Sequence, residues 1–362
     1  MRIALEATWV QGQPTGVGMY VRGLLSGLAE IDGENEYLLL HSSRSWSGPD
    51  LPSRFEPVSY RLGKKSAALA WRLGRVLKRH GADVYHATFT TDVPPRIDVP
   101  VCTTVHDLFP LTHGDQCGRL TGWLFRRMLR WTVSNTNLFI ANSRFVAREI
   151  TRILGVGAQR VVTVPLAPCL PPGPHPRETG LDCLLCVGAV EPRKGQLPLL
   201  EAYASLVRRG RPMPGLVFAG PDRGDARRLL RRIEELQLGG KVRRLSYVSD
   251  RQREELYRNA SLFLMPSSYE GFGLPMLEAM SYGLPVVCSD IPPLREIGVG
   301  GVVYVEPGNV AQWSEAISSL MGDEARRTTM SRFAVERAGQ FTWKACACKT
   351  LECYERAVKR RH

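Results

Sequence analysis

Residues 265–296 read MPSSYEGFGLPMLEAMSYGLPVVCSDIPPLRE. The apolar run just before them, 262–265, predicts a buried strand. Pro275 suits the first position of a helix, because its missing N–H would have no intrahelical partner there. Gly283 and Pro285 end that helix, and residues 286–288 predict the next buried strand. The stretch therefore predicts strand, loop, helix and strand, the repeating unit of a parallel sheet covered by helices.

Two carboxylates, Glu270 and Glu278, lie eight residues apart in this unit. Glu270 falls in the loop and Glu278 one turn into the helix, so both can border one cleft. The helix N-terminus offers free N–H groups that attract phosphate or sugar oxygens. A carboxylate pair ordinarily suggests acid and base acting across a glycosidic bond. Both groups here lie on one side with no carboxylate opposite, so we interpret them as ligand-holding groups.

The rest of the chain alternates strand and helix signals in two blocks. Strands are expected at 3–5, 37–40, 84–86, 101–105, 138–140 and 161–164, with helices at 18–29, 66–79, 122–132 and from Ser143. Six prolines in 165–179 exclude helix and central strand, so this segment is the expected linker. The alternation restarts at 184–187, and a long helix is expected from Trp343 to about Arg360. We therefore expect two α/β domains, at 1–168 with helix 343–360 and at 180–342.

Composition is that of a globular protein, with 362 residues, 44% hydrophobic and 23% charged. The amino terminus, MRIALE, does not resemble a signal peptide, and no apolar run has the length needed to span a bilayer. We expect a cytoplasmic protein. Nine cysteines, an odd number, are scattered along the chain. Cys183 and Cys186 have CxxC spacing but no second pair, so buried structural thiols are expected there and at Cys346 and Cys348 rather than zinc ligands.

The net charge of +13 bears on partners. Basic residues concentrate in 64–79 and 126–130, both expected as amphipathic helices. Two interpretations stay open: solvated surface faces, or attraction to anionic lipid head groups or a phosphate-bearing acceptor. Of these two interpretations, peripheral contact with an anionic membrane is the more specific. A nucleic-acid partner is not expected, because no recognition motif with stacking aromatics accompanies the charge.

Three loops at predicted strand ends carry chemical groups. Residues 12–20, which include Gly16, let the backbone approach a phosphate or sugar, but Val21 breaks the dinucleotide fingerprint; a plain turn is the alternative. Arg193 and Lys194 follow a buried strand directly and could neutralise a diphosphate, against the alternative of a solvated pair. His106 could bind or polarise a sugar hydroxyl, against the alternative of a core histidine. His86 is expected to be structural.

These motifs resemble the family 4 glycosyltransferases. The resemblance rests on the paired glutamates with GFGLP between them, EPRKG at 191–195, TGVGMY at 15–20, VHD at 105–107 and FTW at 341–343. It covers nearly the whole chain. It implies the GT-B fold: two doubly wound Rossmann-like domains facing a cleft, with the C-terminal helix crossing back to the N-terminal domain. The first domain would then bind the acceptor and the second the nucleotide sugar.

The resemblance also implies roles. Arg193 and Lys194 would hold the donor diphosphate, Glu278 the ribose, and Glu270 the donor sugar. Gly16 would contact the diphosphate, and His106 would lie near the sugar. The remaining donor-binding residues implied are Gly271, Phe272, Gly273, Leu274 and Val248. Some relatives carry an arginine where this chain has Ala189, so diphosphate binding should depend more on Arg193 and Lys194.

The implied reaction is transfer of a sugar with retention of its anomeric configuration. An Asp-x-Asp metal motif is absent from the sequence, so no metal or other cofactor is expected. The amino terminus and the EPRKG loop most resemble bacterial mannosyltransferases of surface-polysaccharide assembly. We therefore expect a hexose, mannose from GDP-mannose, to be transferred to a glycan or lipid-linked acceptor. A UDP- or other NDP-sugar donor, a sugar-nucleotide epimerase of the same fold, and a binding protein on an inactive scaffold are the alternatives.

Overall fold

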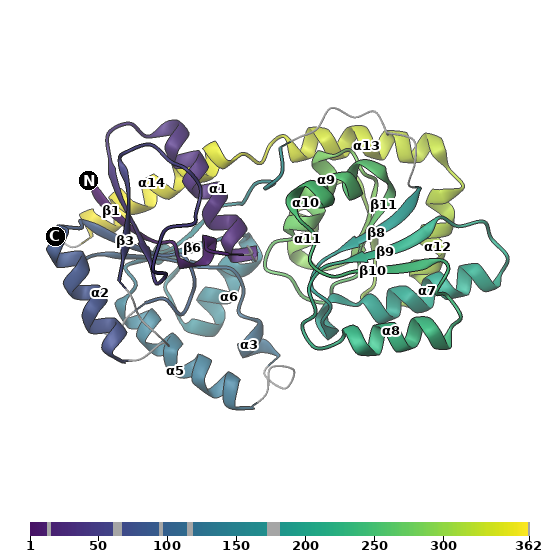
Figure 1. Ribbon diagram of the computed structural model, residues 1–362, viewed down its shortest axis with the longest axis horizontal. Helices are drawn as coiled ribbons and strands as arrows, with labels where there is room; N and C mark the ends of the chain where they lie inside the picture. The colour runs from purple at the N-terminus through teal and green to yellow at the C-terminus, as the bar shows by residue number, and fades with distance from the viewer. Residues whose placement is uncertain (13–15, 61–66, 94–96, 114–118, 172–181, 361–362) are drawn as a thin grey trace. The chain divides into compact units, whose positions relative to one another are not determined.

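The computed structural model describes residues 1–12, 16–60, 67–93, 97–113, 119–171 and 182–360. Contacts divide the chain into two compact units, Met1–Ala167 with Thr342–His362, and Pro168–Phe341. Each unit is a parallel sheet flanked by helices (Figure 1). Most of the expected linker, from 172 on, and residues 13–15 of the first glycine-rich loop lie outside the described residues, as do Lys64 and Lys65.

The first unit contains a seven-stranded sheet in the order β3-β2-β1-β4-β5-β6-β7. Its strands are β1 Arg2–Glu6, β2 Glu36–His41, β3 Phe55–Ser59, β4 Val84–Ala87, β5 Val101–Val105, β6 Leu138–Ala141 and β7 Val161–Thr163. All neighbours pair in parallel. Burial of entire strands, as in VCTTV of β5, is what a parallel sheet covered on both faces requires.

The helices of the first unit connect these strands and cover them. They are α1 Gly16–Ile31, α2 Ala67–Arg79, α3 Phe109–Thr112, α5 Arg119–Asn135, α6 Arg144–Leu154 and α14 Trp343–Lys359, with the short η1 Thr8–Val10 and η2 Ala158–Arg160. Ser143 caps α6 as expected, its Oγ accepting the Val146 N–H at 3.1 Å.

The C-terminal helix α14 returns to the first unit and packs along α1. Gly23 and Gly27, one turn apart, lie on the same face of α1, and a Cβ at either position would collide with Trp343. The two glycines therefore create the space that α14 fills. His86 fixes this packing further, because Nδ1 lies 2.7 Å from the Tyr354 hydroxyl and Nε2 lies 2.8 Å from Thr104 Oγ1. His86 is fully buried, which agrees with its expected structural role.

The second unit contains a six-stranded parallel sheet in the order β10-β9-β8-β11-β12-β13. Its strands are β8 Cys183–Val187, β9 Gly215–Ala219, β10 Val242–Leu245, β11 Ala260–Met265, β12 Val286–Ser289 and β13 Val302–Val305. Its helices are η3 Pro192–Lys194, α7 Gln196–Arg208, α8 Ala226–Glu235, α9 Asp250–Asn259, α10 Leu274–Ser281, α11 Pro292–Gly298, α12 Val310–Met321 and α13 Glu324–Ala338. Apolar side chains of α7, α8 and α12 share one core with the sheet.

Two sequence expectations need correction. Cys348 is exposed rather than buried, because it lies on the outer face of α14, whereas Cys183, Cys186 and Cys346 are buried as expected. Burial raises the pKa of the Cys186 and Cys346 thiols to about 12. Pro275 occupies the second position of α10, not the first, because Leu274 already has helical geometry.

Candidate functional site

The strand order of the second sheet places β8 beside β11, where the direction of chain progression reverses. Loops that follow the two strands at such a switch point meet at the carboxyl edge of the sheet, the usual ligand site in open α/β sheets. The loop after β8 carries Arg193 and Lys194, and the loop after β11 carries Glu270. Topology alone thus brings these three side chains to one place.

The backbones of these two loops are joined directly. The Ser268 N–H donates to the Arg193 carbonyl at 2.8 Å. Gly195, with φ +67°, lies so close to the Pro266 carbonyl that any Cβ would collide with it. A glycine is therefore required at the end of the EPRKG motif, both for its left-handed backbone and for this close approach.

Charged side chains converge on Glu270, which is 7% exposed. Lys194 Nζ lies 2.5 Å from Glu270 Oε1, and Arg193 Nη1 lies 3.8 Å from Oε2. Arg193 also pairs with Glu191, its Nη2 lying 2.8 Å from Oε1, and donates to the Tyr269 carbonyl at 3.2 Å. The two cations are thus held in fixed positions by two carboxylates, and the four formal charges sum to zero.

The pKa of Glu270 results from opposing effects. Burial raises the pKa of this carboxyl, but the charges of Lys194 and Arg193, with hydrogen bonds from Lys194 and Ser267, bring it below the ordinary value of 4.5. Glu270 is therefore ionised at neutral pH. An ionised Glu270 keeps the Lys194 ammonium in place by a charge-assisted hydrogen bond.

Glu278 on α10 has a separate set of partners. It is 4% exposed; its Oε2 accepts the Tyr257 hydroxyl at 3.0 Å and lies 3.3 Å from Arg253 Nε. Burial raises the pKa of Glu278 above 4.5, although Arg253, Tyr257 and the Cys169 backbone N–H oppose the shift. Arg253 and Tyr257 both lie on α9, one turn apart, so α9 presents a cation and a hydroxyl to one carboxylate.

The backbone at the start of α10 requires a glycine. Gly273, the N-cap residue, has φ +122°, and a Cβ there would lie 2.6 Å from Leu294 Cδ2. Gly271 and Phe272 are buried, and Leu274 is half-buried. Val248, another of the expected donor-binding residues, is buried in the loop between β10 and α9.

Two expected site residues belong to the first unit. Gly16 is the first residue of α1 and is exposed, with open space around the position of a Cβ. His106 follows β5, its Nε2 lies 3.0 Å from the Thr88 carbonyl, and its ring contacts Tyr20 edge-on. Burial lowers the pKa of His106, so its imidazole is neutral at pH 7. The Nε2–H then donates to Thr88.

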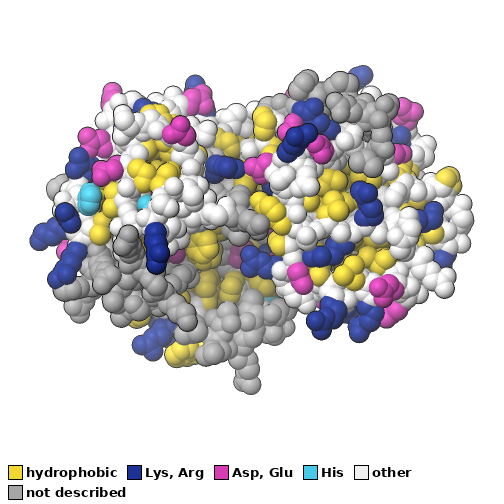
Figure 2. All heavy atoms as spheres, viewed as in Figure 1, with side chains coloured by type: hydrophobic (Ala, Val, Ile, Leu, Met, Phe, Trp, Pro, Cys, Tyr) yellow, Lys and Arg dark blue, Asp and Glu magenta, His cyan; other side chains and the backbone are white. Residues whose placement is uncertain are grey.

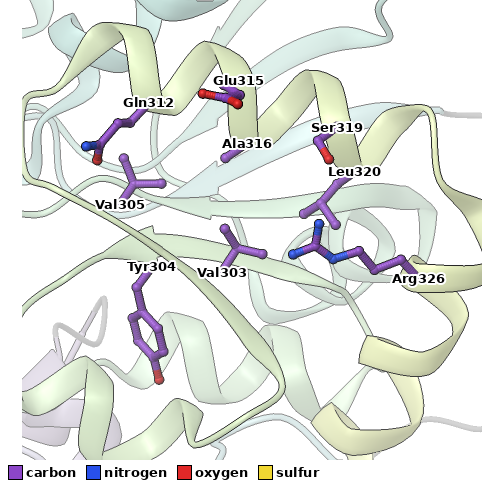
Figure 3. Close-up of a pocket in the computed structure, with 9 residues that line it drawn as sticks. All are labelled: Val303, Tyr304, Val305, Gln312, Glu315, Ala316, Ser319, Leu320 and Arg326. Carbon is purple, nitrogen blue, oxygen red and sulfur yellow. The ribbon is translucent and has the colours of Figure 1, made fainter.

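The second unit also has a cavity of about 400 Å³ elsewhere, between β13, α12 and α13. Gln312, Glu315 and Ser319 line it along α12, and Arg326 reaches it from α13 (Figure 3). It contains none of the expected site residues. Among the described residues, no three His, Cys, Asp or Glu side chains cluster as metal ligands would.

Comparisons with known proteins identify the family of the chain. Residues 14–167 match the family model "Glycosyltransferase Family 4", and residues 173–337 match "Glycosyl transferases group 1". A D-inositol 3-phosphate glycosyltransferase of Kineococcus radiotolerans is 30% identical over 74% of this chain and 68% of its own length. The chain is a family 4 glycosyltransferase. An O-antigen chain mannosyltransferase B of Escherichia coli is 29% identical to this glycosyltransferase over 98% of the chain and all of the relative.

Solved structures show that the glycosyltransferase has the GT-B fold. Sucrose-phosphate synthase from Thermosynechococcus elongatus superposes with a TM-score of 0.80 at 19% identity, covering 99% of this chain and 100% of that one. HepE from Anabaena, solved with UDP-glucose, gives a TM-score of 0.77 at 18% identity over 97% and 98% of the two chains. Among the described helices of the glycosyltransferase, none combines the length and apolar character needed to cross a bilayer.

Three residues of the site had no role assigned from the sequence: Glu191, Arg253 and Tyr257. Glu191 lies inside the EPRKG motif, but only the structure shows that it pairs with Arg193. Arg253 and Tyr257 lie on α9, a helix whose start is marked by a capping box of Ser249 and Gln252. That S-x-x-Q spacing is the signal from which the start of α9 could have been found, but it does not reveal that Arg253 and Tyr257 face Glu278.

Proposed function

We propose that this glycosyltransferase transfers mannose from GDP-mannose to a glycan or lipid-linked saccharide during assembly of a surface polysaccharide. The observation that carries the proposal is the similarity to the Escherichia coli O-antigen mannosyltransferase, which covers 98% of this chain and the whole of that relative. Many relatives share only part of the chain, such as the inositol-phosphate enzyme at 74%. The charged cluster of the second unit supplies the chemistry that a sugar nucleotide requires.

Breaking the bond between the sugar and the diphosphate leaves negative charge on a phosphate oxygen. Arg193 and Lys194 would stabilise that charge, because both are cations held in fixed positions at the carboxyl edge of the second sheet. Glu270 and Glu191 would hold the two cations in position before the donor arrives, so no reorganisation is needed during the reaction. Retention follows when the acceptor hydroxyl attacks from the face that the diphosphate leaves. The departing phosphate oxygen takes the hydroxyl proton.

Glu278 would bind the donor ribose through its carboxylate. The Tyr257 hydroxyl and the Cys169 N–H donate to this carboxylate, and the Arg253 cation lies beside it. All three favour the ionised form, which can accept hydrogen bonds from a pair of sugar hydroxyls. Gly271, Gly273 and the start of α10 would approach the diphosphate through backbone N–H groups. His106 and Gly16 would act from the first unit, near the sugar and the diphosphate respectively.

A UDP-sugar donor is the second candidate. HepE, which has the same fold, is named with UDP and glucose, but at 17–18% identity this likeness concerns the fold alone. The two relatives described above are named as a mannosyltransferase and a glycosyltransferase, which favours sugar transfer over epimerisation. We also propose that no divalent ion is needed, because two fixed cations take the place that a metal ion occupies elsewhere. The enzyme would act at the inner face of the cytoplasmic membrane, where a lipid-linked acceptor is reached.

A donor panel tests these proposals together. Purified protein is incubated with GDP-mannose, UDP-glucose, UDP-galactose and UDP-N-acetylglucosamine, with and without EDTA, and release of the nucleoside diphosphate is measured. We expect turnover with GDP-mannose above all others, unchanged by EDTA. Preference for a UDP-sugar would replace the first candidate with the second. Complete loss of turnover in EDTA, restored by Mg²⁺ or Mn²⁺, would refute metal independence.

A further inference from the structure

The outward face of α5 has an unusual composition. Among the residues of α5 whose side chains are described, the exposed ones are Trp123, Arg126, Arg127, Arg130, Trp131 and Ser134. They follow Trp123 at spacings of three, four, seven, eight and eleven, which places them on a single stripe of the helix. Trp123 is 54% exposed and Trp131 is 41% exposed. The opposite face points inward through Leu129 and Thr132, which are buried. We call Trp123, Arg126, Arg127, Arg130 and Trp131 the α5 stripe.

The placement of the tryptophans on α5 differs from that in an ordinary surface helix. In such a helix the large aromatic side chains face the core and charges of both signs face water. Here both tryptophans of the described helix face outward, while a threonine takes a buried position. The Thr132 hydroxyl needs a hydrogen bond to the Thr90 carbonyl, at 2.7 Å, to be accommodated there. Core packing therefore does not account for either tryptophan.

The charge on the α5 stripe is entirely positive. The sequence has no Asp or Glu between residues 116 and 148, a stretch with six arginines. Among the described residues, Arg126, Arg127 and Arg130 form no ion pair with a carboxylate; the guanidinium of Arg127 lies 5.8 Å from the Trp123 ring centre. Figure 2 shows basic and hydrophobic side chains next to each other at the edge of the first unit, where Figure 1 places α5.

An exposed stripe that combines tryptophan and arginine is best suited to one kind of partner, a lipid bilayer. Tryptophan prefers the polar–apolar boundary of a bilayer, where its ring is buried and its N–H stays hydrated. Arginines on the same face bind lipid phosphates, and a helix that lies in the interface plane needs only a shallow apolar contact. The tryptophans are eight residues apart, so they would enter the head-group region about 12 Å from each other along the helix.

We propose that the α5 stripe docks this glycosyltransferase onto an anionic lipid surface. The inference rests on the proposed function only for the purpose of docking, which is to give the enzyme access to a lipid-linked acceptor. α5 contacts α3, which begins three residues after His106 at the carboxyl edge of the first sheet. Docking through α5 therefore brings the loop that carries His106 toward the bilayer surface. The acceptor would be presented to the first unit from the lipid.

Vesicle co-sedimentation tests the surface directly. Full-length protein is mixed with vesicles of phosphatidylcholine alone, or with 30% phosphatidylglycerol, at low and high salt. We expect binding to the anionic vesicles only, weakened by salt. The triple variant Arg126→Gln/Arg127→Gln/Arg130→Gln should lose about fivefold in partition for each arginine, and so about 100-fold together. Trp123→Ser/Trp131→Ser should lose at least about tenfold, because it removes the apolar contact.

Matched variants control for charge and for hydrophobicity. Arg223→Gln/Arg227→Gln/Arg228→Gln removes three exposed charges from the second unit, and Phe333→Ser removes an aromatic side chain that is 53% exposed. Both should bind vesicles as the wild type does. Quenching of tryptophan fluorescence by brominated lipid should occur in the wild type and fall in Trp123→Ser/Trp131→Ser. Circular dichroism establishes that all variants remain folded.

Several results would overturn the proposal. They are equal binding to neutral and anionic vesicles, equal loss in the control triple variant, or no lipid quenching of the tryptophans. Retention of an oligonucleotide that depends on the α5 stripe, without vesicle binding, would assign the stripe to nucleic acid instead. Donor turnover with a water-soluble acceptor is measured on the same samples without vesicles. Absence of vesicle binding by the wild type with intact turnover would refute the docking surface alone, whereas absence of turnover in every sample would refute the proposed function alone.

Discussion

Replacing Lys194 by alanine should weaken both folding and catalysis, by two separable routes. The folding route runs through Glu270, which is 7% exposed and has the Lys194 ammonium 2.5 Å away. Removing one partner of a buried ion pair costs about 3–5 kcal/mol, because the other charge stays buried and unpaired. Arg193 Nη1 remains 3.8 Å from Glu270, so the lower end, about 3 kcal/mol, is expected. That loss lowers the Tm of a unit of this size by about 6–12 °C.

The catalytic route runs through the donor diphosphate. One positioned donor at a developing negative charge typically contributes about 10²–10³ in rate. Lys194→Ala should therefore lower kcat/KM by about that factor even where the protein is fully folded. Measurement at 15 °C, well below the melting transition, separates this loss from unfolding.

The double variant Lys194→Ala/Glu270→Gln distinguishes the two routes. A glutamine at position 270 carries no charge, so it can stay buried without Lys194 and leave no unpaired ion. Most of the unfolding free energy lost in Lys194→Ala should therefore return in the double variant. Turnover should not return, because the ammonium is still absent. Urea unfolding of the second unit gives the free energies, and release of nucleoside diphosphate gives the rates.

The pH dependence follows from the direction of the pKa shift at Glu270. The folded-state pKa lies below the unfolded value of 4.5, so the pair stabilises the protein above that pH and loses its contribution as the pH falls through the folded pKa. The stability difference between wild type and Lys194→Ala should shrink below about pH 4.5. Turnover in the double variant equal to wild type would refute the role of Lys194 at the diphosphate. An unchanged stability in the single variant would refute the buried pair.

Three further predictions concern other parts of the two units. Burial lowers the pKa of His86 from 6.5 to about 3 in the folded protein. The unfolding free energy of the first unit, measured in urea, should therefore fall by about 2 kcal/mol from pH 7 to pH 5. The variant His86→Gln should lose that pH dependence. Gly273→Ala should destabilise the second unit by about 2–4 kcal/mol, because φ is +122° and the new Cβ would lie 2.6 Å from Leu294 Cδ2; an unchanged Tm would contradict this. Arg253→Met should lower the unfolding free energy of the second unit by about 3 kcal/mol at pH 7. The loss should be smaller at pH 5, because Glu278 without its cation protonates readily there. Equal losses at both pH values would count against the ion pair of Arg253 and Glu278.

The two sheets could be predicted from the sequence because their strands are buried on both faces. Runs such as 101–105 and 260–265 are apolar or small along their entire length, and they alternate with amphipathic helices. Strand β3 had no such signal. Its sequence FEPVS contains two polar side chains and a proline, which an edge strand tolerates because only one side forms hydrogen bonds.

The sequence predicted only those residues of the candidate site that lie in recognisable loops. Arg193, Lys194 and Glu270 stood out because each lies in the loop that follows a buried strand, and parallel strands bring such loops together. The ion pairs among them depend on side-chain geometry that spacing does not reveal. Arg253 was missed for a different reason: a charged residue on the polar-looking helix DRQREELYRN gives no sign of burial until Glu278 lies opposite it.

The central claim is that Arg193 and Lys194 hold the donor through its diphosphate. Calorimetric titration with GDP and GMP, and with UDP and UMP, tests it without any acceptor. We predict that the wild type binds one diphosphate at least about 100-fold more tightly than the matching monophosphate, in EDTA, and that Lys194→Ala loses most of this difference. Equal affinity for diphosphate and monophosphate, or an undiminished difference in Lys194→Ala, would contradict the account.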